Sequence, residues 1–513
     1  MRKKIMRYLC VVIGMMLLLS GCVQSTSKSD SKEITKMSQL KNASIGVWSG
    51  SICESACRKC LPDANYFYYD TTGDMATSVM QGKTDAFCIT PPYFSIMKYE
   101  LPELEALKET VGSFSVHFIL RPDKRGEKIR TEINEYLARA RKSGEIDEIN
   151  ARWYGEDESL KVIDRSGLTG KNGTIKLAVC GDTPIGYIRG NEVVGSEVEI
   201  LTRFCTEYGY DLQIDVLTFS AIIPSMQTCK YDVAAASFEY SKERAKIVKF
   251  SDKTHDEKII LVVRKKSKSG NLSIFQSIKK SFNRTFLRYQ RWKLFLGGIS
   301  QTLLITVLSM IGGTALGFLI YLLCRNGGKA ANTISRFAMW LIDGTPMVVL
   351  LMIFYYIIFS QTRINGTWVA IVCFSLTFAC SMFGMLTSGV KAVGNGQLEG
   401  ARALGYTDFQ AFFKLILPQA AMHFLPTYQT AVVAHIKSTA IVGYIAVQDL
   451  TKVSDLIRSN TFDPFFPLLA TAAIYFVLAW ILTTMIGWVQ RRIDSKNRDK
   501  KKILAGLQGG EML

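Results

Sequence analysis

Beyond about residue 290 the chain contains apolar stretches of membrane-spanning length, and no other feature limits its fold as strongly. Each stretch is roughly 20 residues long, which is the length that an α-helix needs to cross the apolar core of a bilayer. Before residue 290, charged residues are spread throughout, as in a soluble globular protein. Within the segment 294–490, the sequence therefore predicts an all-α membrane domain of five transmembrane helices, at 294–323, 337–359, 367–390, 422–445 and 466–489.

The net charge of +18 is concentrated beside these stretches. The segment 267–293 contains many Arg and Lys residues and no acidic residue, and we expect this juxtamembrane linker to lie along anionic lipid headgroups. If the chain enters the membrane from outside, the basic loops and the tail 491–513 lie in the cytoplasm, in agreement with the positive-inside rule. The sequence has no recognisable nucleic-acid-binding motif, so membrane lipids, and not nucleic acid, are the expected acidic partner.

Residues 1–21 have the layout of a secretory signal, with a basic start and a short apolar run. The run ends in LSGC at Cys22, which resembles a bacterial lipoprotein cleavage box and implies lipidation of Cys22. The alternative is a signal anchor that happens to contain a cysteine. Residues 22–40 are largely polar and are expected to form a flexible tether. The chain from Cys22 to the first span is then expected to lie outside the cytoplasm of a bacterial cell, with the membrane domain in its cytoplasmic membrane.

Two parts of the soluble region alternate short apolar strands with amphipathic helices, which predicts mostly parallel sheets covered by helices. The segment 80–86 (MQGKTDA) is similar to 226–233 (MQTCKYDV), and each lies where a helix is expected to end and a buried strand to begin. Two similar α/β lobes suggest a clamshell that binds a ligand in the cleft at the strand ends. The expected strands are 44–47, 66–69 and 86–89 in one part, and 175–179, 212–216 and 232–236 in the other.

Short segments between 191 and 264 resemble lobe one of the type 3 extracytoplasmic solute-binding proteins, which mostly serve polar amino acids. These segments are 194–198 (VGSEV), 221–226 (AIIPSM), 230–232 (KYD), 242–246 (KERAK) and 250–252 (FSD). The segment 44–155 resembles lobe two with its closing helix. The resemblance implies a solute-binding domain at 41–266, with lobe two at 41–165 before lobe one at 173–266, as in a circular permutation.

The same resemblance implies the ligand contacts. Arg244 falls on the family arginine that binds a substrate carboxylate through its planar guanidinium, although a surface ion pair is the alternative. Ser51 matches a hydroxyl that meets the same carboxylate, and Tyr187 matches an aromatic flank of the ligand. Thr90 replaces an acid that pairs with the α-amino group, and Glu239 replaces a small hydroxyl residue. These departures leave open a degenerate or repurposed pocket.

Twelve cysteines are present, and Cys53, Cys57 and Cys60 form a C-x3-C-x2-C pattern. Radical enzymes use this spacing for an iron–sulfur cluster, but we expect the segment to be exported, and no histidine lies nearby to complete a metal site. The favoured interpretation is buried or disulfide-linked helix cysteines, with no metal site and no cofactor on this chain.

The loop 396–405 (GQLEGARALG), followed by 415–418 (LILP), resembles the EAA loop of binding-protein-dependent ABC permeases. The resemblance implies two short helices bent at a glycine, which dock on a cytoplasmic ATPase subunit. It also implies a second permease copy or a paralogue. The segments 344–346 (GTP) and 355–356 (YY) resemble the polar amino-acid permease branch. The resemblance to the EAA loop implies that five residues couple the chain to the ATPase subunit, namely Glu399, Ala401, Gly405, Leu417 and Pro418.

His435 and Lys437 lie in the fourth predicted span, where ionisable groups are candidates for a translocation path. A lysine that reaches the membrane interface is the alternative reading of Lys437. The chain has no G-x-x-x-x-G-K-[ST] phosphate loop, so ATP is expected on the separate ATPase subunit.

The sequence thus predicts the permease of an ATP-driven importer, fused to its solute-binding domain and without covalent chemistry of its own. The expected solute is a polar amino acid or a related small carboxylate. One rival is a ligand-sensing membrane receptor or channel-like protein with a degenerate binding domain, and another is a cell-wall enzyme with an accessory clamshell.

Overall fold

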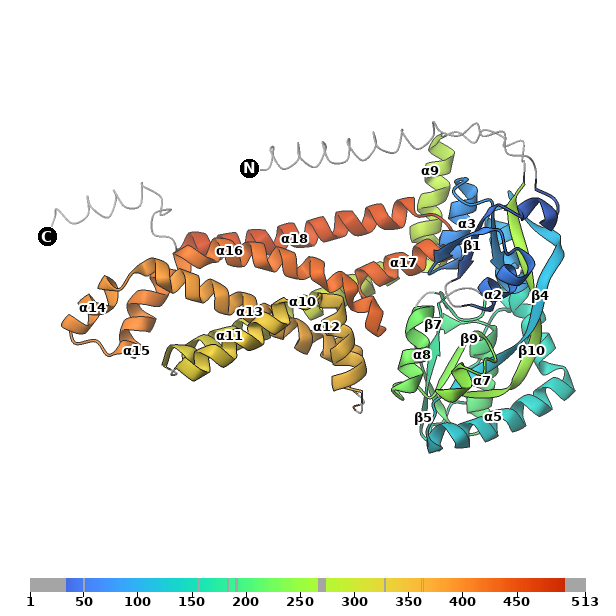
Figure 1. The fold of residues 1–513 in the computed structure, drawn as a ribbon, viewed down its shortest axis with the longest axis horizontal. Helices are drawn as coiled ribbons and strands as arrows, with labels where there is room; N and C mark the ends of the chain where they lie inside the picture. The colour runs from blue at the N-terminus through green and yellow to red at the C-terminus, as the bar shows by residue number, and fades with distance from the viewer. Residues whose placement is uncertain are drawn as a thin grey trace.

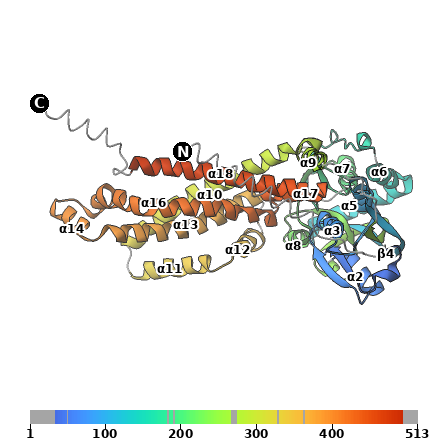
Figure 2. The ribbon, with the colours of Figure 1, turned by 90° about the horizontal axis from the view of Figure 1, so that it is seen from above.

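We analysed a computed structural model that describes residues 34–48, 51–155, 157–181, 184–189, 192–265, 274–326, 329–360, 362 and 364–493. The predicted signal peptide, Cys22, residues 22–33 of the tether and most of the predicted tail 491–513 lie outside these residues. An α/β domain and a helical bundle lie end to end in the structure (Figure 1), and the view from above shows the same arrangement (Figure 2).

The α/β domain contains the repeated unit that the sequence predicts. In each lobe the first strand of the unit lies between the other two and pairs with both in parallel, in the orders β2-β1-β3 and β8-β5-β9. All six expected strands are confirmed within two or three residues. They are β1 (Ser44–Trp48), β2 (Asn65–Tyr69), β3 (Ala86–Ile89), β5 (Thr174–Val179), β8 (Asp211–Val216) and β9 (Val233–Glu239).

Two long antiparallel strands, β4 (Leu104–Leu120) and β10 (Lys249–Arg264), join the lobes into one eight-stranded sheet. The sequence analysis did not predict them, because their burial does not alternate regularly along a single face. Their register shifts between Phe250 and Lys253 and again before Asp256, near the crossing from one lobe to the other. Such irregularities increase local twist and bend a strand, so the two lobes face each other across a cleft.

Helices α2 (Ile52–Cys60), α3 (Thr72–Met80) and α4 (Pro91–Glu100) cover the first lobe, and α7 (Ser196–Glu207) and α8 (Phe219–Gln227) cover the second. Helices α5 (Lys124–Ser143) and α6 (Glu145–Tyr154) share a hydrophobic core with β5 and β8. The predicted lobe boundary at 165–173 is therefore not the boundary of the packed cores. The second lobe takes residues from both sides of it, through a core that contains Trp153 and Phe204.

Three helices of the bundle are long and apolar enough to cross a membrane, namely α10 (Trp292–Asn326), α13 (Gly366–Val393) and α18 (Phe465–Ile493). They match three of the five predicted spans. The number reaches five if each of two bent helix pairs forms one span. The short helix α9 (Ile274–Phe282) precedes this bundle.

The predicted span 337–359 is wrong as a straight helix. Helix α11 (Lys329–Asp343) and the segment from α12 (Met347–Ile353) to Ile358 meet at 105°. The break falls at Gly344-Thr345-Pro346, where proline removes a backbone donor and disfavours helical geometry in the residue before it. The other bent pair, with a break of 56°, contains α16 (Leu417–Ser438), the 3₁₀ turn Thr439–Ile445 and α17 (Leu450–Thr461).

The predicted coupling loop folds as α14 (Gly396–Ala403) and α15 (Asp408–Ala411). This loop lies at the end of the bundle that is far from the α/β domain (Figures 1 and 2).

The α/β domain is docked on the near end of the bundle. Helix α3 packs on α17, and Arg458 of α17 forms ion pairs with Asp74 and Asp455. In the second lobe, Lys230 donates hydrogen bonds to the backbone carbonyls of Phe359 and Thr362. Both lobes therefore contact the membrane domain.

At Gly73 the backbones of α3 and α17 lie in close contact, because a Cβ built on Gly73 lies 2.7 Å from the Cα atom of Ser459. Gly73→Ala is expected to push α3 away from α17, at a cost of roughly 1–3 kcal/mol typical of overpacking. Faster amide hydrogen exchange in α17 of the full chain is the predicted result. Gly384→Ala is the control, since a Cβ there meets nothing within 4 Å. Equal exchange in α17 of both variants contradicts the docked arrangement.

Candidate functional site

A cavity lies between the two lobes, with about 490 Å³ of empty space including its opening to solvent. It lies where the strand ends of both repeated units face each other, as the clamshell interpretation predicts. Four of the five predicted ligand contacts line it, two from each lobe. They are Ser51 and Thr90 from the first lobe and Glu239 and Arg244 from the second.

The second lobe supplies both charged residues of the cavity. Glu239 ends β9, and Arg244 lies in a 3₁₀ turn five residues later. Burial lowers the pKa of the Arg244 guanidinium, and the nearby Glu239 charge opposes that shift. Burial raises the pKa of Glu239, against the opposing charges of Arg244 and Lys59. The guanidinium is therefore a partly desolvated cation, which suits tight binding of a carboxylate.

The first lobe supplies helix N-termini. Ser51 is the N-cap of α2, and its hydroxyl donates to the carbonyl of Trp48 at 2.7 Å. Thr90 is the N-cap of α4, and its buried Oγ1 makes no hydrogen bond to any described residue. The positive end of a helix dipole favours negative charge, so this wall complements Arg244 in binding an anion.

Tyr187 is not part of the cavity, and the prediction that it flanks a ligand is wrong. It lies in the hairpin of β6 (Tyr187–Arg189) and β7 (Glu192–Val194), and it is buried in the second-lobe core. Its ring packs edge-on against Trp153 of α6, with ring centroids 6.2 Å apart.

Aromatic side chains from both lobes line the cavity, and the sequence analysis missed them. Trp48 and Phe219 meet across the cleft with ring centroids 5.1 Å apart, and Phe219 stacks on Phe238 at 5.4 Å. Tyr93 contacts Trp48 edge-on, and Phe114 completes the set. Trp48 and Phe219 stand where a strand ends or a helix begins, which is the signal that could have found them.

A buried carboxyl lies directly behind the cavity wall. Ser237 lines the cavity with a left-handed backbone (φ 48°), and its amide N lies 3.5 Å from the Oε2 atom of Glu197. Glu197 is fully buried near the N-terminus of α7. Burial raises the pKa of Glu197 to about 8, and the neighbouring Glu257 adds to the shift. Glu197 is therefore largely protonated at neutral pH.

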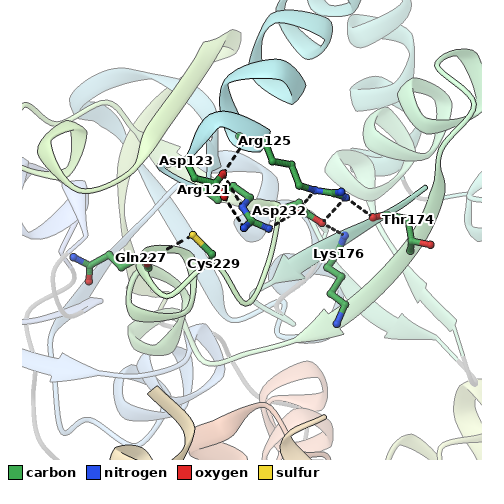
Figure 3. Close-up of polar contacts among 9 residues, drawn as sticks. Arg121, Asp123, Arg125, Thr174, Lys176, Gln227, Cys229 and Asp232 are labelled. Atoms are coloured by element: carbon green, nitrogen blue, oxygen red, sulfur yellow. Dashed lines mark hydrogen bonds and ion pairs between the residues drawn. The ribbon is translucent and has the colours of Figure 1, made fainter. Parts of the chain in front are cut away.

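The 230–232 motif does not reach the cavity. Asp232 is buried at the other end of β9, where Arg121 (2.9 Å) and Arg125 (2.7 Å) bind its Oδ1 atom and the amide of Lys176 donates to Oδ2 at 2.9 Å (Figure 3). This network joins the start of α5 to β5 and β9. The motif thus has a structural role in the second lobe.

Cys53, Cys57 and Cys60 form no disulfide in the structure, and the first two are buried whereas Cys60 is exposed. Cys53 and Cys57 pack with Cys88 in the first-lobe core, and the Cys60 thiol donates to the carbonyl of Val111 at 3.3 Å. Within the described ranges, no group of three or more His, Cys, Asp or Glu side chains is placed to hold a metal ion.

The coupling loop presents both predicted and unpredicted residues at the far end of the bundle. Glu399 is exposed, and Gly405 has φ 81°, a left-handed conformation that glycine adopts freely. Ala401, Leu417 and Pro418 lie in the helices that flank the bend. Leu404 (78% exposed) and Phe409 (70% exposed) were missed, although large apolar residues beside the bend could have indicated a contact surface.

His435 and Lys437 do not meet in a shared site. His435 is buried, its Nε2 lies 2.7 Å from the Ser309 Oγ, and it packs against the rings of Phe374 and Phe378. Lys437 is exposed on α16. Neither residue lines the cavity between the lobes.

Comparison with known proteins identifies the helical bundle. Residues 296–495 match the family described as binding-protein-dependent transport system inner membrane component. The chain is 27% identical over 203 residues to the histidine/lysine/arginine/ornithine transport system permease protein HisM of Salmonella typhimurium, covering 37% of this chain and 86% of HisM.

A putative glutamine transport system permease protein GlnP of Rickettsia bellii is 29% identical over 201 residues, covering 39% of this chain and 90% of GlnP. One chain in the crystal structure of an amino acid ABC transporter with histidines is 28% identical to this chain. The superposition covers 44% of this chain and all of that chain, with a TM-score of 0.37. The chain thus joins helices that match a membrane permease family to a two-lobed α/β domain built on one eight-stranded sheet.

Glu197 makes the stability of the α/β domain depend on pH. Because its folded pKa of about 8 exceeds the unfolded value near 4.5, its contribution is complete below pH 4.5 and is lost as pH rises through 8. Glu197→Gln is expected to reduce the fall in melting temperature between pH 5 and pH 8.5. Thermal unfolding of a fragment spanning residues 33–268 measures this, with the exposed Glu192→Gln as control. An unchanged pH dependence in Glu197→Gln contradicts the assignment.

Proposed function

We propose that the chain is the permease and the fused solute-binding subunit of an ATP-driven importer for a polar amino acid or a related small carboxylate. The observation that carries this proposal is the cavity between the lobes, with Arg244 in its wall, on the same chain as a permease domain. The relatives named as amino-acid transport permeases support the solute class.

In this proposal Arg244 binds the carboxylate of the solute through two parallel N–H···O contacts. The α2 N-terminus at Ser51 faces the same charge. Glu239 binds the α-amino group in place of the acid that is missing at Thr90, and the aromatic walls enclose the side chain of the solute. The lobes close on the solute by a hinge motion at the irregular pairing of β4 with β10.

The proposal places the α/β domain outside the cytoplasm, attached through lipidated Cys22, and places α14, α15 and the C-terminus inside. A separate ATPase subunit binds ATP and docks on the surface that contains Glu399, Leu404 and Phe409. A second permease copy or a paralogue completes the translocation path. The opposite positions of the α/β domain and the coupling loop on the bundle support this arrangement.

Arg244→Ala is expected to remove charge-assisted hydrogen bonds worth about 1.5–3 kcal/mol, which corresponds to a loss of affinity of roughly ten- to more than a hundred-fold. Calorimetry of residues 33–268 against polar amino acids and related carboxylates measures the loss. The exposed Lys242→Ala is the matched control in the same turn. If the unmodified fragment binds none of these solutes, the pocket is repurposed and the receptor alternative gains support.

Glu239→Gln separates amino acids from other carboxylates. If Glu239 binds the α-amino group, this variant loses affinity for an amino acid by about tenfold or more and retains affinity for the matching α-hydroxy acid. Competition between the two solutes on the same fragment measures the difference. Equal losses for both solutes contradict the assigned role of Glu239.

Leu404→Asp tests the coupling surface. A charge at this exposed apolar position is expected to weaken ATPase docking and to reduce ATP-driven uptake by about tenfold or more, because buried interface charges are costly. Solute binding stays unchanged, since the loop is far from the α/β domain that contains the cavity (Figure 1). Uptake by cells that express the full chain together with its proposed ATPase subunit provides the measurement. Gln397→Asp, also exposed on α14, is the control.

A further inference from the structure

A second cavity lies between the α/β domain and the membrane domain, and we call it the vestibule. Both lobes and the membrane domain form its walls, and it has about 880 Å³ of empty space including its opening to solvent. Its lining includes Asp70, Asp74, Phe219, Tyr444, Lys452 and Arg458.

Phe219 is shared by the vestibule and the cavity between the lobes. Its neighbours Thr218 and Ser220 line only the vestibule, whereas Phe238 lines only the cavity between the lobes. The Phe219 side chain therefore stands at the boundary of the two spaces.

The two aromatic rings at this boundary are held differently. The Trp48 indole donates a hydrogen bond to the carbonyl of Asp70 at 2.9 Å, which fixes the ring to the first lobe. The half-buried Phe219 ring is placed by its contacts with Trp48 and Phe238. Opening the clamshell separates Trp48 from Phe219, because they belong to different lobes. When the Phe219 side chain then rotates, it loses contacts with other rings but breaks no hydrogen bond.

We propose that Phe219 is the gate through which a solute leaves the cavity between the lobes and enters the vestibule. The inference rests on the proposed import function and names the residue that controls delivery. The floor of the vestibule contains Tyr444 in the 3₁₀ turn Thr439–Ile445, which continues directly from α16. The other end of α16 begins at Leu417, beside the coupling loop. One continuous segment thus joins the coupling loop to the space behind the gate.

The chemistry of the vestibule fits a zwitterion. Its lining carries both signs of charge, from Asp70, Asp74 and Asp455 and from Lys452 and Arg458, and Arg458 pairs with Asp74 and Asp455. Paired charges of both signs give a polar wall with little net charge, which accommodates a carboxylate and an ammonium on one small molecule. The vestibule is therefore suited to a small zwitterionic solute.

Access of a small thiol reagent to Cys88 tests the gate without knowledge of the solute. Cys88 lines the cavity between the lobes. The test uses the full chain in lipid nanodiscs. Methyl methanethiosulfonate is expected to react with Cys88 about tenfold faster in Phe219→Ala than in the chain that retains Phe219. Peptide mass spectrometry gives the rate at Cys88 alone. Phe219→Leu gives a smaller increase, and Ser220→Ala, which alters only the vestibule wall, gives none.

Blocking the vestibule shows whether the reagent enters through it. In the double variant Phe219→Ala, Tyr444→Cys, a bulky maleimide is first attached to the introduced thiol. The rate at which methyl methanethiosulfonate reacts with Cys88 is then expected to fall to the rate in the chain without substitutions. An unchanged Cys88 rate in Phe219→Ala overturns the proposal. A raised rate that the maleimide does not lower also overturns it, because the new opening then lies elsewhere.

Dissociation of a radiolabelled solute connects the gate to import. If the full chain binds a polar amino acid, its dissociation rate is expected to rise about tenfold in Phe219→Ala and to be unchanged in Ser220→Ala. An unchanged rate in Phe219→Ala overturns the role of Phe219 in solute release. If the unmodified chain binds no polar amino acid, the proposed solute class fails, while the thiol experiment still decides whether Phe219 separates the two spaces.

Discussion

The pairing of β4 with β10 is the interaction on which the rest of the α/β domain depends. These strands cross from one lobe to the other and make one sheet out of two repeated units. A continuous sheet fixes the position of each lobe relative to the other, and the irregular register near Phe250 and Asp256 bends the sheet where it crosses between them. The cleft between the lobes therefore has a defined shape, and the bend lies where the proposed hinge motion occurs.

Local periodicity in the sequence predicted six of the strands and the repeated unit, and the resemblance to known families implied the coupling loop and the four residues that line the cavity. Those features depend on short-range periodicity or on short motifs. Tyr187 was wrongly placed because only the packing of a hairpin against Trp153 determines its direction. The aromatic walls were missed for the same kind of reason, since contacts between distant segments decide which side of a helix or strand faces a cavity. The bend at Gly344-Thr345-Pro346 has a local cause in the proline, and this signal was overlooked.

The cavity combines one cation and one carboxyl group on the same lobe with neutral hydroxyl residues on the other. Burial opposes the charge on both Arg244 and Glu239, so each charged form is more stable when a complementary group of a ligand replaces water. Thr90 cannot supply that complement, because its hydroxyl is neutral. A ligand that carries both signs of charge satisfies both residues without a third charge from the first lobe.

The domain interface combines ion pairs and hydrogen bonds to backbone carbonyls with apolar contacts, since Leu456 packs in the second-lobe core and Phe462 in the first-lobe core. Partly exposed ion pairs are individually weak, at about 0–1 kcal/mol each. Weak contacts are sufficient here because both domains belong to one chain, and linkage gives an effective concentration on the order of millimolar. Fusion therefore lowers the intrinsic affinity that the two domains need in order to stay docked.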